Sequence, residues 1–318
     1  MKENEIIELF HQPGDAARLD DCALIPPGEE RVMLATTDSM AEGTHFRLEW
    51  SAPEDLAAKL FQSNLSDLAA SGGRPTTGLL SLGLPAEHEP DFIRRFAGEL
   101  SAQFREHNAR MVGGDTFRAR SMVLSLTLLG TALRNLTRDG GQPGDALYVS
   151  GSLGLSLAGL RLLPARDGVD EFHIADAALR DEALNKHLRP RARAQWGRLL
   201  AADESVHAAM DVSDGIAQDA PRLARASGLR LEIDLDALPL HPGLEDYFAP
   251  GDAAQSGEEY ELLFLADENF QAPFPCTRIG RALTNEEIAS SPDGEPGPVH
   301  WVRGGQKSTL PAGGFRHF

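Results

Sequence analysis

The chain has 318 residues, of which 42% are hydrophobic and 25% are charged, as is typical of a globular protein with one large domain or two medium-sized ones. Its formal net charge of −18 at pH 7 repels polyanions, which excludes nucleic acid as a preferred partner. Cys22 and Cys276 are far apart and form no disulfide framework or CxxC motif, so we expect a cytoplasmic protein. Residues 1–9 do not resemble a signal peptide, and no apolar run approaches the roughly 18 residues of a membrane helix, so we expect no membrane partner.

The first acidic clusters lie near the start of the chain. Residues 4–10 predict a short amphipathic helix, and Asp20-Asp21 precede an apolar run. An apolar strand over residues 32–35 is then expected to end at Thr36-Thr37-Asp38. Hydroxyl and carboxylate oxygens side by side suit a hard cation such as Mg²⁺. The alternative is that these residues merely end a strand.

A helix is predicted from Ser51 to about Ser71, because Ser51 and Glu54 have the spacing of a capping box and Pro53 stands in the first turn. Asp67 is the only charged residue between positions 61 and 72, among small and apolar neighbours. A solvated helix face would carry more charges, so we expect the carboxylate of Asp67 to bind a ligand.

Residues 111–116 predict a strand that ends in a Gly pair followed by Asp115, where backbone N–H groups can approach an anion. The most turn-rich stretch, residues 138–145, predicts a boundary between an N-terminal domain of residues 1–143 and a C-terminal domain of residues 144–318.

In the second half, Leu188-Arg189-Pro190 is expected to start a helix that runs to about Asp203. A strand over residues 206–210 leads into Asp211-Val212-Ser213-Asp214-Gly215 and a further helix. Two aspartates there can bind a metal, or can simply stabilise the positive end of the helix dipole. The Gly-rich stretch at 151–156 matches neither G-x-G-x-x-G nor the P-loop.

If these acidic groups meet in one cleft, they repel each other strongly. Two carboxylates about 5 Å apart cost roughly 3 kcal/mol at an effective dielectric near 20, so such a cluster needs cations. The implied ligand is a magnesium nucleotide held without a P-loop. Phosphoryl transfer onto a phosphate needs no strong base, because the acceptor is largely ionised at pH 7. We therefore expect no catalytic general base.

Together the motifs resemble the thiamine-monophosphate kinase family, which belongs to the ATP-binding superfamily that includes aminoimidazole ribonucleotide synthetase. They span nearly the whole chain in the expected order. The matching segments are Asp20-Asp21-Cys22-Ala23-Leu24, Thr36-Thr37-Asp38, Gly43-Thr44-His45-Phe46, Asn64-Leu65-Ser66-Asp67-Leu68-Ala69-Ala70, Gly113-Gly114-Asp115-Thr116, Leu136-Thr137-Arg138, Leu188-Arg189-Pro190, Asp211-Val212-Ser213-Asp214-Gly215 and Gly257-Glu258-Glu259-Tyr260-Glu261.

This resemblance implies an α/β fold of two domains. The N-terminal mixed sheet would pair with its twin in a homodimer, and the C-terminal α/β domain would pack over the ATP cleft. It implies direct phosphoryl transfer from ATP to thiamine monophosphate, giving thiamine diphosphate and ADP, with several Mg²⁺ ions. Carried over to this sequence, the metal ligands are Asp21, Thr36, Thr37, Asp38, Asp67, Asp115, Asp211 and Asp214. The ATP contacts are Gly114, Asp115, Arg138 and Ser213, and the contacts to thiamine monophosphate are His45, Glu258 and Phe315.

The sequence departs from the family pattern at a few positions. Leu19 replaces the usual Gly before the first Asp pair, Ala192 replaces a Pro, and His107 stands where an adenine-side Tyr is expected. Sister activities are the main alternatives: selenophosphate synthetase, a purine-biosynthesis ligase, or a non-catalytic nucleotide-binding relative. The first would need a reactive thiol, and Cys22 suits that role poorly because flanking aspartates raise a thiol pKa.

Overall fold

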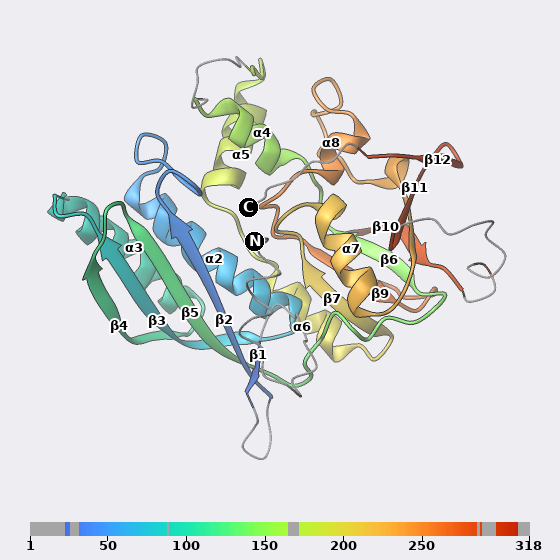
Figure 1. Ribbon diagram of the computed structural model, residues 1–318, viewed down its shortest axis with the longest axis horizontal. Coiled ribbons are helices and arrows are strands. Elements are labelled where there is room, and N and C mark those ends of the chain that lie inside the picture. Colours follow the sequence, from blue (N-terminus) through green and yellow to red (C-terminus); the bar gives the residue numbers. More distant parts are fainter. Residues whose placement is uncertain are drawn as a thin grey trace.

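The computed structural model describes residues 23–25, 32–87, 89–164, 172–284, 287 and 297–310. Two β-sheets stand next to each other in this part of the chain, with helices between and around them (Figure 1). The predicted helix at 4–10, the pair Asp20-Asp21, and Phe315 lie outside the described residues.

The N-terminal sheet has the strand order β1-β2-β5-β3-β4. Its neighbours pair antiparallel except β3 and β4, which are parallel, so the sheet is mixed as predicted. The strands are β1 (Ala23–Ile25), β2 (Val32–Ala41), β3 (Arg74–Leu84), β4 (Arg110–Arg118) and β5 (Val123–Ala132). Helices α2 (Pro53–Ala70) and α3 (Pro90–Glu106) cover one face, where Leu34, Phe61, Phe96 and Leu126 are buried in one core.

The expected strand ends at Thr36-Thr37-Asp38 and Gly114-Asp115 were wrong, because both segments lie inside longer strands. β2 pairs with β5 over ten consecutive residues, from Val32 to Ala41. β4 likewise continues through the Gly pair to Arg118. The β-branched threonines suit a pleated strand, and the continuous ladder satisfies their backbone groups better than a turn would.

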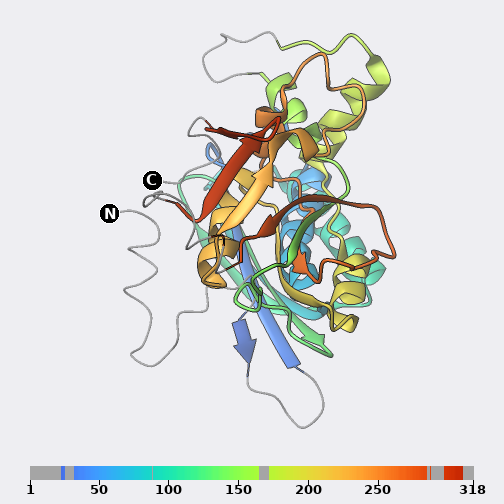
Figure 2. The same cartoon turned by 90° about the vertical axis from the view of Figure 1, so that its right-hand side faces the viewer.

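The C-terminal sheet has the order β12-β11-β8-β10-β6-β9-β7, and Figure 2 shows β8 and β11 side by side. Its strands are β6 (Ala146–Ser150), β7 (Val206–Asp211), β8 (Leu231–Asp234), β9 (Leu262–Ala266), β10 (Cys276–Ala282), β11 (Val299–Arg303) and β12 (Gln306–Ser308). The helices of this half are α4 (Leu155–Leu162), α5 (Ala177–Leu188), α6 (Ala194–Ala202), α7 (Ile216–Ala226) and α8 (Pro250–Ala254), with a 3₁₀ turn at Leu235–Ala237.

The helix expected to run from Leu188 to Asp203 was also wrong. Helix α5 ends at Leu188, and α6 begins only at Ala194. Pro190 disfavours the helical conformation for Arg189, and it has no N–H to donate to a preceding turn. The chain therefore breaks at the motif rather than starting a helix there.

Helix α2 joins the two halves. All of its residues are buried except Glu54, Asp55 and Asp67. Its last turn packs on α6, and a Cβ atom at Gly197 would lie 1.9 Å from the backbone oxygen of Ala69, so only glycine permits this close approach. Asp67 is thus the one residue beyond the first turn of α2 that is not buried.

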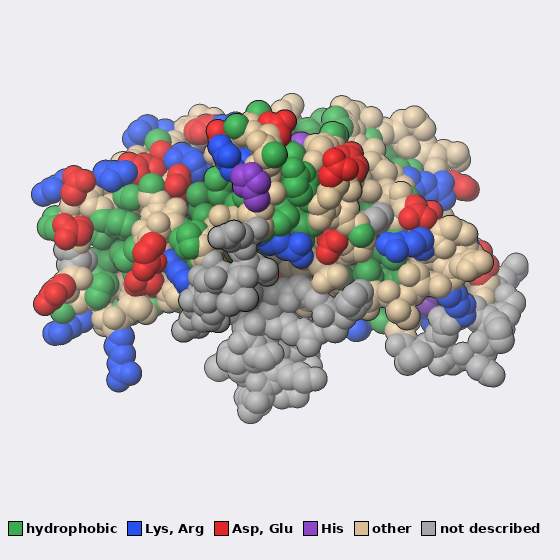
Figure 3. All heavy atoms as spheres, turned by 90° about the horizontal axis from the view of Figure 1, so that it is seen from above, with side chains coloured by type: hydrophobic (Ala, Val, Ile, Leu, Met, Phe, Trp, Pro, Cys, Tyr) green, Lys and Arg blue, Asp and Glu red, His purple; other side chains and the backbone are tan. Residues whose placement is uncertain are grey.

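Two further properties bear on function. Within the described ranges, no helix is long and apolar enough to cross a membrane. On the face seen from above, acidic and basic side chains are interspersed (Figure 3), so the negative charge is not gathered into one patch there. The proposed division at residues 143/144 falls in the segment between β5 and β6 and stays a prediction.

Candidate active site

A cavity of about 580 Å³ lies between the two halves of the molecule. It is lined by β2, the loop after it, α2, α4, α5, the turn between β7 and α7, α8, and the segment before β9. The predicted site residues in its wall are His45, Asp38, Asp67, Asp211, Ser213, Asp214 and Glu258.

One face of α2 forms a wall of the cavity. Lys59, Ser63 and Asp67 follow each other at intervals of four residues, which places them on the same side of the helix. The rise of 1.5 Å per residue separates Lys59 from Asp67 by about 12 Å along the axis. Lys59 and Asp67 therefore mark the two ends of the cavity, and the Asp67 end is the acidic one.

At the acidic end, β2 and α2 are joined by hydrogen bonds. The hydroxyl of Thr36 donates to the carboxylate of Asp67, and the backbone N–H of Asp38 donates to Oδ1 of Asn64 at 3.1 Å. Thr36 and Asp38 share the strand face that points to α2. Thr37 points to the opposite, uncovered face, where its hydroxyl donates to the backbone oxygen of Leu126 at 3.2 Å.

The end of β7 and the turn after it contribute the other carboxylates of this end. Asp211 is 2% exposed, and one of its oxygens accepts a hydrogen bond from the hydroxyl of Ser66 at 2.7 Å. Asp214 lies beside the guanidinium of Arg222, with 2.5 Å between the charged atoms. The turn between them is fixed by Asp219, whose carboxylate accepts hydrogen bonds from the backbone N–H groups of Ser213 and Asp214 at 3.1 and 3.0 Å. Burial raises the pKa of Asp219 to about 7, although Arg222 opposes this.

At the other end, Glu258 projects into the cavity beside Lys59, whose Nζ atom lies 2.8 Å from Oε2. Burial acts to raise the pKa of Glu258, but the charge and hydrogen bond of Lys59, together with the nearby His187 and His45, outweigh burial, so the pKa is lowered. The neighbouring His187 is buried, and its Nδ1 atom lies 3.4 Å from Oε2 of Glu258. Burial and the charge of Lys59 lower the pKa of His187 to about 4, so the ring is neutral at pH 7.

The three glutamates of the motif at 257–261 have different surroundings. Glu259 is buried and accepts hydrogen bonds from the backbone N–H groups at the start of α4. Glu261 is buried as well and pairs with Arg193. Only Glu258 lies in the cavity wall, with a left-handed backbone conformation of φ +55° that is uncommon for a residue other than glycine. The ion pair with Lys59 holds the Glu258 side chain in this position.

Other predicted residues are not gathered in this cavity. Asp115 lies on β4, an edge strand, in one cross-strand row with Ser81, Ser125 and Ser39. Its side chain is on the uncovered face of the sheet together with Thr37, and its neighbour Gly114 is exposed on the same strand. Arg138 lies outside the cavity wall, near enough to Asp219 for its charge to lower the pKa of that group.

Four functional candidates were missed by sequence reasoning: Lys59, Trp50, His187 and Arg161 all line the cavity. Lys59 had a detectable signal, because it is a lone lysine in an apolar stretch two helical turns before Asp67. His187 had none, since its position depends on how α5 packs against the other half.

The oxygen-rich acidic end fits a hard cation. Asp38, Asp67, Asp211 and Asp214 offer carboxylate oxygens, and Thr36 offers a hydroxyl, which is the donor set that Mg²⁺ prefers.

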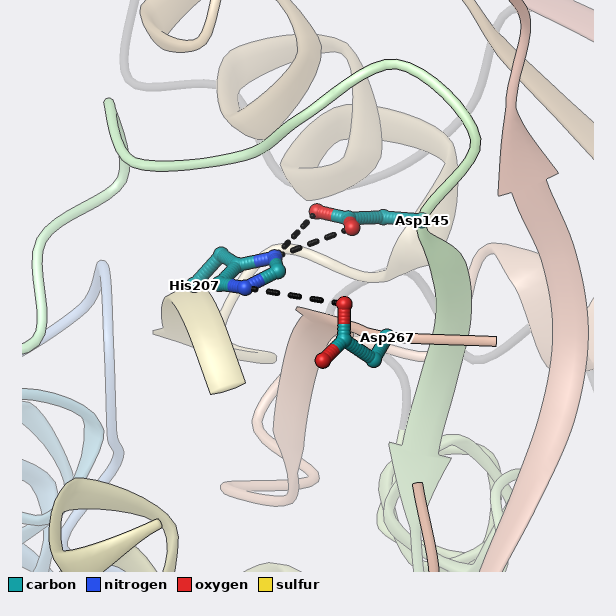
Figure 4. Close-up of side chains that lie close together, drawn as sticks. All are labelled: Asp145, His207 and Asp267. Carbon is teal, nitrogen blue, oxygen red and sulfur yellow. Dashed lines mark hydrogen bonds and ion pairs between the residues drawn. The ribbon is translucent and has the colours of Figure 1, made fainter. Parts of the chain in front are cut away.

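A different cluster of potential ligands lies at the other end of β7. His207 Nδ1 is 2.9 Å and 3.0 Å from the two carboxylate oxygens of Asp145, and Nε2 is 3.8 Å from Asp267 (Figure 4). His207 and Asp211 are four positions apart on the strand, which is about 13 Å. This cluster is therefore no part of the cavity, and it links the starts of β6 and β7 to the end of β9.

Comparisons with known proteins identify the class to which this fold and cavity belong. The family models for AIR synthase related protein match residues 19–132 with the N-terminal domain and residues 142–272 with the C-terminal domain. The chain therefore belongs to the AIR synthase-related proteins.

Relatives identify the family within that class. The chain is 38% identical over 319 residues to the thiamine-monophosphate kinase of Leptospira interrogans serogroup Icterohaemorrhagiae serovar Lai, covering 100% of this chain and 98% of that one. It is 35% identical over 299 residues to the thiamine-monophosphate kinase of Escherichia coli (strain K12), covering 89% of each. A solved structure described as AaThiL complexed with AMPPCP and TMP superposes with a TM-score of 0.84 at 31% identity, covering 100% of this chain and 97% of that one. The chain is a member of the thiamine-monophosphate kinase family, which confirms the predicted family and two-domain α/β fold.

Proposed function

We propose that this chain transfers the terminal phosphoryl group of ATP to thiamine monophosphate, giving ADP and thiamine diphosphate. One observation carries the proposal: a single cavity holds four aspartates at one end and the Glu258–Lys59 pair at the other, about 12 Å away along α2. The relative described as complexed with AMPPCP, an ATP analogue, and TMP supports two phosphate-bearing ligands in one site.

The acidic end is proposed to bind the phosphates of ATP through metal ions. Asp38, Asp67, Asp211 and Asp214, with the hydroxyl of Thr36, would hold Mg²⁺, and Ser213 would contact ATP. Magnesium, when bound, neutralises the repulsion between carboxylates and phosphates and polarises the transferred group. Asp21 and Phe315, which lie outside the described residues, remain predicted contacts to the metal and to the thiamine part.

The other end is proposed to bind thiamine monophosphate. A carboxylate such as Glu258 and an aromatic ring such as Trp50 suit the cationic thiazolium ring. Lys59 is buried in the same wall and can offset the charge of the acceptor phosphate, which is largely ionised at pH 7. His45 lies in this part of the wall as a third predicted contact. The ring of His187 is neutral, so it cannot offset the negative charge of a phosphate. The transfer requires no general base.

A homodimer is proposed through the uncovered face of the N-terminal sheet. Met33, Leu79 and Phe117 are 37%, 42% and 43% exposed on that face, and large apolar side chains gathered in this way mark interaction surfaces. Pairing would bury them and would also enclose Thr37 and Asp115, two predicted metal ligands that lie outside the cavity of the single chain. Light scattering after size-exclusion chromatography tests this; a monomer at micromolar concentration would contradict it.

A cytoplasmic location is also proposed, since Cys22 and Cys276 suit a reducing compartment. Cell fractionation followed by immunodetection tests this location.

The function is tested by incubating the purified chain with Mg-ATP and thiamine monophosphate and separating the products by chromatography. Thiamine diphosphate and ADP should form in equal amounts. Formation of ADP without thiamine diphosphate would point to another acceptor, and a lack of both would contradict the proposal.

A further inference from the structure

A second cavity of about 260 Å³ lies where β3 begins, β5 ends and α6 passes by. It shares no lining residue with the cavity described above. Its wall is mostly apolar, with two arginines at its side: Ala132, Leu133, Ala201, Ala202, Arg74 and Arg198. Leu133 is 83% exposed, so apolar surface is available to a ligand there.

The two arginines have no counterion within the part of the chain that the structure describes. Neither Arg74 nor Arg198 makes an ion pair or a side-chain hydrogen bond with another residue in the described part of the chain. Arg74 and Arg198 are not required as donors to the backbone oxygens near the end of α6. Arg134 already donates hydrogen bonds to four of these oxygens, between residues 200 and 206. In a chain of net charge −18, two guanidinium groups that have no partner among the described residues lie beside one cavity and can bind an anion there.

A third polar group at the cavity also lacks a partner. The hydroxyl oxygen of Thr131 is buried and makes no hydrogen bond with any residue that the structure describes. Thr131 is directly opposite Arg74 in the β3–β5 ladder, so the two side chains lie on the same face of the sheet. A buried hydroxyl without a partner is costly, and an acceptor oxygen of a ligand would remove that cost.

The cavity is built into the backbone rather than formed by loose side chains. Gly72 has φ +75°, and a Cβ atom there would lie 2.2 Å from the Cβ of Ala201. Only glycine allows the start of β3 to lie so close to α6. The guanidinium groups therefore come from two elements, a strand and a helix, that are held at a fixed separation.

We propose that this cavity binds a small organic oxyanion, a phosphate monoester or a carboxylate carried on a compact apolar body. Arg74 and Arg198 bind the oxyanion, since their planar groups match its oxygens in bidentate pairs. The hydroxyl of Thr131 donates to it as well. Leu133 and the alanines contact the apolar body, which a free inorganic anion does not have. The small volume limits the body to about the size of one ring.

The test is a calorimetric titration of the full-length protein with phenyl phosphate, inorganic phosphate and benzoate. The double variant Arg74→Gln/Arg198→Gln is compared with Arg105→Gln, which removes from α3 an exposed arginine that has no ion pair with a described residue. Wild type and Arg105→Gln should bind phenyl phosphate or benzoate more tightly than inorganic phosphate. Which of the two organic probes binds more tightly distinguishes a phosphate monoester from a carboxylate. The double variant should lose at least about 100-fold in affinity for that probe, since each charge-assisted hydrogen bond contributes about 1.5–3 kcal/mol.

Three outcomes would overturn the proposal. If the double variant and the wild type bind both organic probes equally well, the probes bind outside the second cavity, for example in the first one. Equal affinity for inorganic phosphate and the organic probes would remove any role for the apolar wall. A changed oligomeric state of the double variant, measured by light scattering, would assign the arginines to a subunit contact instead.

Discussion

Replacing Asp67 with asparagine should make the metal-free protein more stable and the enzyme much less active. The change removes one negative charge from a cavity that also holds Asp38, Asp211 and Asp214. Two carboxylates about 5 Å apart repel by roughly 3 kcal/mol at an effective dielectric near 20. Because Asp67 is only partly buried, we expect a gain of about 1–3 kcal/mol. The asparagine oxygen can still accept the hydrogen bond from Thr36.

This gain should appear as a rise in melting temperature of at least about 2 °C in EDTA. Kinase turnover should fall by more than about 100-fold, because a metal ligand is lost. The matched control is Asp145→Asn, which removes a buried carboxylate that accepts hydrogen bonds from His207 and from the backbone of Gln142. That variant should lose about 1–3 kcal/mol of stability and keep its kcat.

Differential scanning fluorimetry with EDTA and with Mg²⁺, combined with the kinase assay, measures both properties. A destabilised Asp67→Asn protein with normal kcat would show that Asp67 acts as a structural group, and it would refute the reasoning.

Three further predictions concern single side chains. Glu258→Gln should raise the KM for thiamine monophosphate about tenfold or more and leave the KM for ATP nearly unchanged, since one charged contact is lost; equal effects on both would contradict the assignment of Glu258. The pKa of His187 is about 4 in the folded protein and 6.5 in the unfolded chain. The neutral ring therefore contributes up to about 3 kcal/mol to the free energy of unfolding above pH 6.5, and this contribution is lost as the pH falls to 4. His187→Gln should therefore weaken the loss of stability between pH 6.5 and pH 4.5 in urea titrations, and an unchanged pH profile would speak against this. Gly197→Ala should cost more than about 3 kcal/mol because its Cβ would meet the Ala69 oxygen at 1.9 Å, whereas Gly98→Ala, with nothing within 4 Å, should gain about 1 kcal/mol; similar melting temperatures of the two variants would refute that packing.

The sequence predicted the family and the general fold, because motifs spread over the whole chain carry both. The sequence also indicated a special role for Asp67, because its neighbours carry no charge. The structure shows why this was possible. Asp67 is the only charged residue between positions 61 and 72, so in the sequence it stands out among the apolar and small residues of a helix that is buried nearly all round.

Strand lengths and faces could not be predicted in the same way. Thr36-Thr37-Asp38 is a plausible strand end when it is considered alone, but the ten-residue ladder with β5 extends the strand through it. The pleat then directs Thr37 and Asp115 to the uncovered face, away from Thr36 and Asp38. Pairing between segments that are distant in the sequence decides how long a strand is and which face a side chain is on. The local sequence does not contain that information.

The residues at the Lys59 end of the cavity come together only through contacts between the two halves of the molecule. Lys59 and Glu258 are 199 positions apart and meet only when α2 packs against the second half. The role of Asp219 could not be predicted from local sequence either. Its carboxylate fixes the turn at Ser213 and Asp214. An aspartate in the first turn of a helix usually interacts only with the helix dipole.

The central claim is that carboxylates from separate elements form one metal site between two phosphate-bearing substrates. The most direct measurement is an anomalous difference map from crystals grown with Mn²⁺, AMPPCP and thiamine monophosphate. We predict peaks between the carboxylates of Asp38, Asp67 and Asp211, in contact with the phosphates of the nucleotide. A map with bound nucleotide but without any peak among these side chains would contradict the claim.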